Sequence, residues 1–224
     1  ITFELMNQAG DSVMSWASNQ FLRMRRGATT PPATKPAASS KAATPSITSL
    51  WDRSDKLPAA RTSQYFEDRH VGEIMDLGSH TFARDEIVAF ARAFDPQPFH
   101  LDEDAAKASL FGGLCASGWH TAAVYVRHNV AFRQTVEAEM RANGVRPAIY
   151  GPSPGFRDLK WIKPVFVGDT IAFLARVSEL RDLKSRPDRG MMIWDAQGRN
   201  QHGDIVFAIT GQILVERRTP LTTV

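Results

Sequence analysis

The chain has 224 residues and is 43% hydrophobic, enough for one large domain with its own core or for one domain with an appendage. Its formal net charge is only +3, and residues 61–224 hold twenty Lys/Arg against twenty Asp/Glu. Because a formally neutral folded part lacks the basic surface that nucleic-acid binding needs, we expect no DNA or RNA partner. No apolar run approaches the roughly 20 residues of a membrane-spanning helix.

Cys115 is the single cysteine, so an internal disulfide is excluded and no Cys/His spacing suits zinc. Its neighbours Leu114 and Ala116 favour a small buried side chain over a nucleophile. A chain without disulfides is most simply placed in a reducing compartment. We therefore expect a cytoplasmic protein without a metal site.

Residues 1–27 mix large apolar side chains with polar ones and end in a cationic run, which predicts an imperfect amphipathic helix. Two interpretations of residues 1–26 remain open. The segment attaches to a membrane, a polymer granule or a partner helix, or it packs on the domain or on a sister subunit. Residues 28–46 contain no acid, aromatic or large aliphatic side chain, so we expect a disordered linker over 28–60.

Regular patterning begins near Tyr65, where residues 65–82 predict a strand and a turn. Residues 85–94 place acids in a first turn before apolar side chains at helical spacing, which predicts a short helix. A second short helix is expected over 102–109, with Asp102 as its N-cap.

The longest helical pattern runs from about Ser117 to Asn143, and strand-like runs follow it. These runs are separated by Gly, Pro, Asn and Asp and cover residues 150–159, 167–178, 191–200 and 205–216. One long helix followed by antiparallel strands predicts an α+β domain whose sheet wraps the helix. We place this domain at 61–218 and a short tail at 219–224.

Residues 94–104 carry the main chemical signal, because Asp95 and His100 lie five residues apart around Pro96 and Pro98. Each proline fixes its own φ and keeps the preceding residue out of the α region, so this stretch is expected to be extended rather than helical. A carboxylate and an imidazole on a rigid turn are a candidate acid/base pair. The helix that begins near Ser117 would direct backbone N–H groups at a developing oxyanion.

This segment resembles the MaoC-like dehydratases, a hotdog-fold family that includes (R)-specific enoyl-CoA hydratases. Three blocks carry the resemblance in the family's order, within about residues 66–217. The blocks are Asp95, Pro98, His100 and Asp102; then Ala116 and Gly118; then Lys163-Pro164-Val165-Phe166-Val167-Gly168-Asp169-Thr170.

Four positions depart from the family pattern. Phe94 replaces a glycine, Gln97 an asparagine, Ser117 a histidine and Trp119 a methionine. If the family's glycine has a positive φ, Phe94 would be strained there by about 1 kcal/mol or more. Gln97 keeps an amide but moves it by one methylene, which is expected to change the shape of the acyl tunnel.

The resemblance implies a single hotdog domain, a homodimer, and a lyase that adds water to a 2-enoyl-CoA or removes it from an (R)-3-hydroxyacyl-CoA. Asp95 would be the general base on water, His100 would share in proton transfer, and the Gly118 N–H would form part of the oxyanion hole. Coenzyme A would be part of the substrate, with no other cofactor.

Four residues are expected to contact the substrate: Gln97, Gly113, Ser117 and Trp119. Structural roles stay open for two of them, because Gly113 is also suited to ending a helix and Ser117 to capping one. Two other functions also stay open, a hotdog acyl-CoA thioesterase and a non-catalytic acyl-thioester-binding protein. His120 and His128 share a helical face without a matching carboxylate and are interpreted as packing or surface residues.

Overall fold

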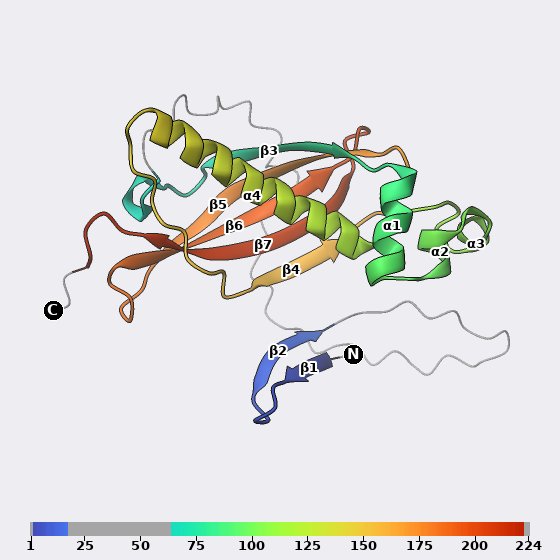
Figure 1. Ribbon diagram of the computed structural model, residues 1–224, viewed down its shortest axis with the longest axis horizontal. Coiled ribbons are helices and arrows are strands. Elements are labelled where there is room, and N and C mark those ends of the chain that lie inside the picture. The colour runs from blue at the N-terminus through green and yellow to red at the C-terminus, as the bar shows by residue number, and fades with distance from the viewer. Residues whose placement is uncertain (1, 18–63, 222–224) are drawn as a thin grey trace, which may run out of the picture. The chain divides into compact units, whose positions relative to one another are not determined.

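The computed structural model describes residues 2–17 and 64–221 (Figure 1). By its internal contacts the chain divides into two units, Ile1–Pro45 and Ser46–Val224. The described part of the first unit is a small hairpin, and that of the second is an α+β domain. The linker expected over 28–60 lies outside the described residues.

The hairpin corrects the helix that the sequence predicted near the N-terminus. Strand β1 (Thr2–Met6) pairs antiparallel with β2 (Ser12–Ala17). The connecting turn is organised by Asn7, whose side-chain oxygen accepts hydrogen bonds from the N–H groups of Ala9 and Asp11, both at 2.9 Å. This Asx-type turn outweighs the irregular helical spacing of the apolar side chains. Residues 2–17 therefore do not form the amphipathic helix from which a membrane, granule or partner contact was predicted.

The domain is built on a five-stranded sheet in the described residues, with the order β3-β5-β6-β7-β4 and antiparallel neighbours throughout. Its strands are β3 (Ile74–Thr81), β4 (Phe156–Trp161), β5 (Thr170–Asp182), β6 (Arg189–Arg199) and β7 (Ile205–Glu216). The long helix α4 (Gly118–Ala142) lies along one face of this sheet (Figure 1). The hotdog architecture predicted from the sequence is confirmed.

The core lies between α4 and the sheet. Along β5 the buried and partly exposed positions alternate, as expected when successive side chains point to opposite faces of a strand. Phe173 and Val177 of β5 pack in one cluster with Val124 and Tyr125 of α4.

Although α4 has 25 residues, no helix in the described part of the chain is long and apolar enough to cross a membrane.

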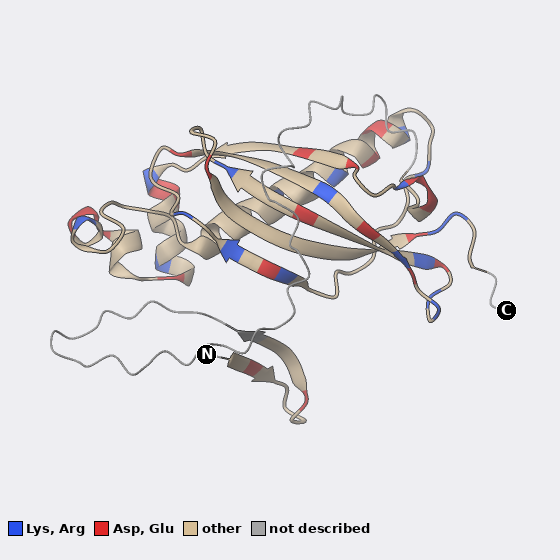
Figure 2. Ribbon diagram, turned by 180° about the vertical axis from the view of Figure 1, so that it is seen from behind, with Lys and Arg blue, Asp and Glu red and all other residues tan. Residues whose placement is uncertain are grey.

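The strands of the sheet contain residues of both charge signs (Figure 2). Lys/Arg and Asp/Glu positions are interspersed along them, and Arg176 of β5 lies opposite Asp195 of β6 in the strand register. Beyond the end of β4, Lys163 forms an ion pair with Asp204 at 2.6 Å. Positions of opposite sign are therefore mixed along the strands, and no described strand carries a continuous basic run.

A buried hydrogen bond joins helix and sheet at the centre of the domain. The indole N–H of Trp194 donates to the Tyr125 hydroxyl at 2.7 Å, and burial raises the pKa of Tyr125 to about 12. Replacing Tyr125 by phenylalanine removes this acceptor while keeping the ring. Because a buried donor without its partner is costly, we expect Tyr125→Phe to lower the free energy of unfolding by about 1–3 kcal/mol, measured by urea denaturation.

Tyr65→Phe is a matched control for this prediction, because the Tyr65 hydroxyl accepts its hydrogen bond from an exposed partner, Arg146. Such a surface change is expected to stay within about 0.5 kcal/mol. Equal decreases in the free energy of unfolding for Tyr125→Phe and Tyr65→Phe would contradict the prediction that the buried hydrogen bond contributes more than the exposed one.

Short helical elements connect β3 to α4 and lie near the N-terminal end of α4 (Figure 1). They are α1 (Arg84–Phe94), α2 (Pro98–Leu101) and α3 (Glu103–Ala108), and the 3-10 helix η2 (Phe66–Asp68) precedes β3. The predicted helices at 85–94, 102–109 and 117–143 are confirmed. Asp102 caps α3 as expected, accepting a hydrogen bond from the Ala105 N–H at 2.8 Å.

Phe94 carries none of the backbone strain considered from the sequence. It is the last residue of α1, and among the described non-glycine residues a positive φ occurs at Asp158, where φ is 55°. The Phe94 side chain is 73% exposed. The end of the helix therefore accommodates phenylalanine at this position without a positive φ.

Candidate active site

The turn that carries the candidate acid/base pair runs from the end of α1 into α2. Asp95 is the C-cap of α1, with φ −151° and ψ 70°, and Gln97 is extended with φ −79° and ψ 140°. The prediction of extended backbone before proline is confirmed for Gln97, whereas Asp95 avoids the α region without being extended. The prediction of an extended stretch fails at His100, which lies in the single turn of α2. Proline at the first helical position, here Pro98, is well suited to starting such a turn.

The Asp95 carboxylate is held by two hydrogen-bond donors. The Gln97 amide donates to Oδ1 at 2.8 Å, and the Ser117 hydroxyl donates to Oδ2 at 2.7 Å. Both residues were predicted to contact the substrate. Their hydrogen bonds to Asp95 were not predicted from the sequence. The two donors come from either side of the carboxylate and fix its orientation.

His100 is held by the backbone of the segment that leads into α4. Its Nδ1 lies 2.8 Å from the carbonyl oxygen of Cys115. Because a carbonyl only accepts, Nδ1 carries the proton of this hydrogen bond. In the neutral ring Nε2 is then a free base, as proton transfer requires.

Asp95 and His100 converge, as the sequence predicted. Asp95 Oδ2 lies 3.6 Å from His100 Nε2, and the side chains are 19% and 6% exposed. This separation exceeds the roughly 2.7–3.2 Å of a direct hydrogen bond, so both atoms stay available to a third group placed beside them. The rings of Phe99 and Phe111 pack beside the imidazole, with centroids 4.5 Å and 6.5 Å away.

The N-terminus of α4 completes the site. Ser117 is the N-cap, and its hydroxyl oxygen accepts a hydrogen bond from the Trp119 N–H at 3.2 Å while it donates to Asp95. Gly118 is the first helical residue, and no described residue accepts a hydrogen bond from its N–H. A free N–H at the positive end of a helix is suited to binding a negatively charged oxygen. The capping role considered for Ser117 is confirmed.

Two further residues at this site were assigned from the sequence. A Cβ added to Gly113 would lie 3.6 Å from the Phe166 ring, an ordinary contact, so the protein itself does not require glycine there. Cys115 is buried, and burial raises the pKa of its thiol to about 11, which agrees with the packing role predicted for it. What the sequence missed is the Cys115 carbonyl, because a backbone group leaves no signal in the residue type.

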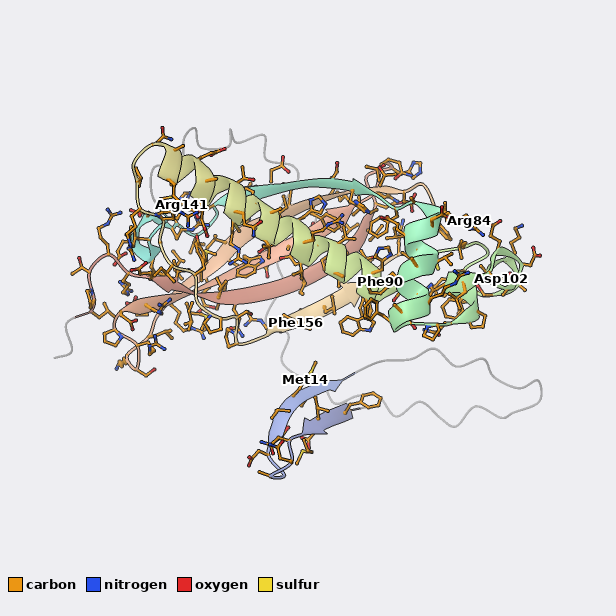
Figure 3. The ribbon with its side chains drawn as sticks, in the orientation of Figure 1. Met14, Arg84, Phe90, Asp102, Arg141 and Phe156 are labelled. Atoms are coloured by element: carbon orange, nitrogen blue, oxygen red, sulfur yellow. The ribbon has the colours of Figure 1, made fainter. Side chains whose placement is uncertain are left out.

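His120 packs beside the site, near the N-terminal end of α4, between two aromatic rings. It stacks on Phe90 at 4.6 Å and meets the edge of Phe82 at 5.2 Å, and Figure 3 shows Phe90 on α1 near the start of α4. Its Nδ1 is buried without a hydrogen-bond partner among the described residues. Burial lowers the pKa of His120, while the charge of Glu86 acts in the opposite direction. The predicted packing role of this histidine is confirmed.

The lowered pKa of His120 makes the stability of the domain depend on pH. The unfolded chain, with a histidine pKa near 6.5, binds a proton that the folded protein rejects, so this stabilisation is complete above about pH 6.5 and is lost as the pH falls below it. His120→Phe keeps a stacking ring without the titration. We expect the variant to lose less stability than the wild type between pH 8 and pH 5.5, measured by urea unfolding. Parallel pH curves would contradict this prediction.

In the described ranges, no three or more His, Cys, Asp or Glu side chains are grouped to hold a metal ion.

Comparison with known proteins agrees with the fold. A solved structure described as the MaoC-like dehydratase from Rhodospirillum rubrum is 36% identical, with a TM-score of 0.55 over 70% of this chain and 99% of that chain. An Archaeoglobus fulgidus structure described as a monoamine oxidase regulatory protein is 26% identical, with a TM-score of 0.57 over 71% and 99%.

A curated relative, the uncharacterized protein YdeM of Bacillus subtilis, is 26% identical over 147 residues, which are 66% of this chain and 95% of the relative. The family described as MaoC like domain matches residues 68–190, a range that contains Asp95, His100 and Gly118. Since this match spans more than half of the chain and includes the acid/base turn and the start of α4, the protein belongs to the MaoC-like family.

Proposed function

We propose that the protein is a hydratase or dehydratase that acts on acyl thioesters. It adds water to the double bond of a 2-enoyl-CoA, or removes water from an (R)-3-hydroxyacyl-CoA, with coenzyme A as part of the substrate. The observation that carries the proposal is the 3.6 Å separation of Asp95 Oδ2 and His100 Nε2 beside the Gly118 N–H. Membership of the MaoC-like family and the similarity to the R. rubrum dehydratase support it.

In the proposed mechanism a water molecule lies beside the pair, within hydrogen-bond reach of both Asp95 Oδ2 and His100 Nε2. Asp95 takes a proton from this water as its oxygen bonds to the β-carbon of the substrate. The electron pair of the double bond moves toward the thioester, and the resulting charge on the carbonyl oxygen is stabilised by the Gly118 N–H. A proton delivered through the Asp95–His100 pair then bonds to the α-carbon. The elements of one water are added, and dehydration is the reverse.

The surrounding contacts support these roles. Gln97 and Ser117 hold the carboxylate in one orientation, and the Cys115 carbonyl leaves His100 Nε2 as the free base of the neutral ring. Acid/base groups of this kind are each worth about 10²- to 10⁴-fold in rate, and an oxyanion donor about 10²- to 10³-fold. Three such groups in one site supply the barrier reduction typical of an enzyme.

Incubation with 2-enoyl-CoAs of several chain lengths, crotonyl-CoA first, tests the proposal. Loss of the enoyl absorbance without release of free thiol is the expected result. Release of free thiol would instead identify a thioesterase, in which the same carboxylate directs water at the carbonyl carbon. No change with any chain length would overturn the proposal in favour of a non-catalytic acyl-binding role.

A homodimer is the proposed assembly. In the described sheet β3 and β4 are the edge strands. An edge strand presents unpaired backbone N–H and C=O groups that are suited to pairing with another chain. Light scattering should give twice the chain mass of 24.8 kDa, and the monomer mass would exclude the dimer.

A further inference from the structure

The indole ring of Trp161, at the end of β4, contacts the first residue of α4. Its Nε1–H donates to the Gly118 carbonyl oxygen at 2.7 Å. A Cβ added to Gly118 would lie only 2.5 Å from the ring, so the indole occupies the space that any side chain at this position would need. Two separate contacts thus hold the Cα and the carbonyl group of the same glycine.

Glycine at the start of a helix is the residue with the greatest backbone freedom, and this glycine carries the free N–H of the site. The peptide on its N-terminal side is fixed by Ser117, whose carbonyl accepts from the Thr121 N–H at 3.2 Å. On its C-terminal side, Trp161 adds a hydrogen bond from outside the helix. The direction of the Gly118 N–H therefore depends on contacts at both ends of the residue.

Trp161 is itself held in a fixed place. It lies opposite Phe207 of β7 in the strand register, and the next residue, Ile162, donates its N–H to the Val206 carbonyl at 2.8 Å. The Trp119 ring meets the indole edge-on, with centroids 5.1 Å apart and an interplanar angle of 74°. A side chain anchored by the sheet and by a second aromatic ring can transmit that rigidity to the helix terminus.

We propose that Trp161 is a positioning residue of the hydratase site: it holds Gly118 so that the free N–H points at the oxygen on which charge develops. The inference rests on the proposed function. Trp161 acts through Gly118 and takes no part in proton transfer, which belongs to Asp95 and His100. Its effect is therefore on the stabilisation of the transition state rather than on the acid/base step.

Trp161→Phe tests this role, because phenylalanine keeps a ring at the end of β4 and lacks the N–H that holds Gly118. With crotonyl-CoA and 2-octenoyl-CoA, we expect kcat to fall about tenfold, a part of the roughly 10²- to 10³-fold that a whole oxyanion donor is worth. KM and the pH dependence of kcat should stay at their wild-type values. The midpoint of thermal unfolding and the oligomer mass, measured on the same samples, should not change.

Phe156→Leu is the matched control, since Phe156 is a half-exposed aromatic residue at the other end of β4 (Figure 3). Its kcat should equal that of the wild type. A wild-type kcat in Trp161→Phe would overturn the role of Trp161 but leave the proposed function standing. An equal loss of kcat in both variants would also overturn this role. So would a loss of kcat in Trp161→Phe that comes with a lower unfolding midpoint or a smaller oligomer mass, because the role would then be merely structural. A wild-type protein that leaves both enoyl-CoAs unchanged would overturn the proposed function and this inference together.

Discussion

Asp95→Asn is expected to lower kcat/KM for enoyl-CoA hydration by about 10²- to 10⁴-fold, the range of a lost general base. An asparagine amide cannot take a proton from water, although it has nearly the same shape as the carboxylate. The variant should fold normally, because the Gln97 amide and the Ser117 hydroxyl can still pair with the new oxygen and nitrogen. The decrease in enoyl absorbance gives the rate, and circular dichroism checks the fold.

Asp102→Asn provides a matched control for this experiment. It makes the same chemical change seven positions away, at the N-cap of α3, where asparagine can accept the Ala105 N–H as well as aspartate does. The control should hydrate enoyl-CoA at the wild-type rate. Wild-type activity in Asp95→Asn would refute the assignment of the base, even if the protein proves to be a hydratase.

The sequence predicted those elements whose signals are local. Asp102 and Ser117 each stand directly before the helix that they cap, and a side-chain cap needs no distant partner. The predicted runs at 167–178 and 205–216 are rich in β-branched residues, and they correspond to β5 and β7, which pair with β6 on either side. Local residue patterns were therefore enough to predict the α+β class, whereas the hotdog topology was predicted from the resemblance to the MaoC-like dehydratases.

Prediction failed where two local signals competed. Residues 2–17 contain apolar side chains that fit a helix poorly, and the turn around Asn7 decides for a hairpin. The single turn Pro98–Leu101 is too short to show a helical period, so the prolines alone suggested extended backbone. In residues 2–17 and in Pro98–Leu101, a few turn residues determine the local structure, and the pattern of the longer segment does not.

The contacts that build the site could not be predicted, because they join residues far apart in the chain. Ser117 meets Asp95 across 22 positions, and Trp161 meets Gly118 across 43. Only the folded sheet and helix bring these groups together. The residues of the candidate acid/base pair were identified from one motif, but the residues that orient them could not be predicted.

His100→Asn should also lower kcat by about 10²- to 10⁴-fold, and it separates the two roles of the imidazole. The asparagine amide nitrogen can take the place of Nδ1 and donate to the Cys115 carbonyl, so the structural hydrogen bond is kept. The group that is lost is Nε2, which faces Asp95 Oδ2 at 3.6 Å. The variant therefore isolates proton transfer from folding.

A matched control makes this experiment decisive. His70→Asn, the same change on an exposed segment, should keep the wild-type rate. If His100→Asn also keeps the wild-type rate, the imidazole only supports the shape of the site, and Asp95 must carry both proton transfers by itself.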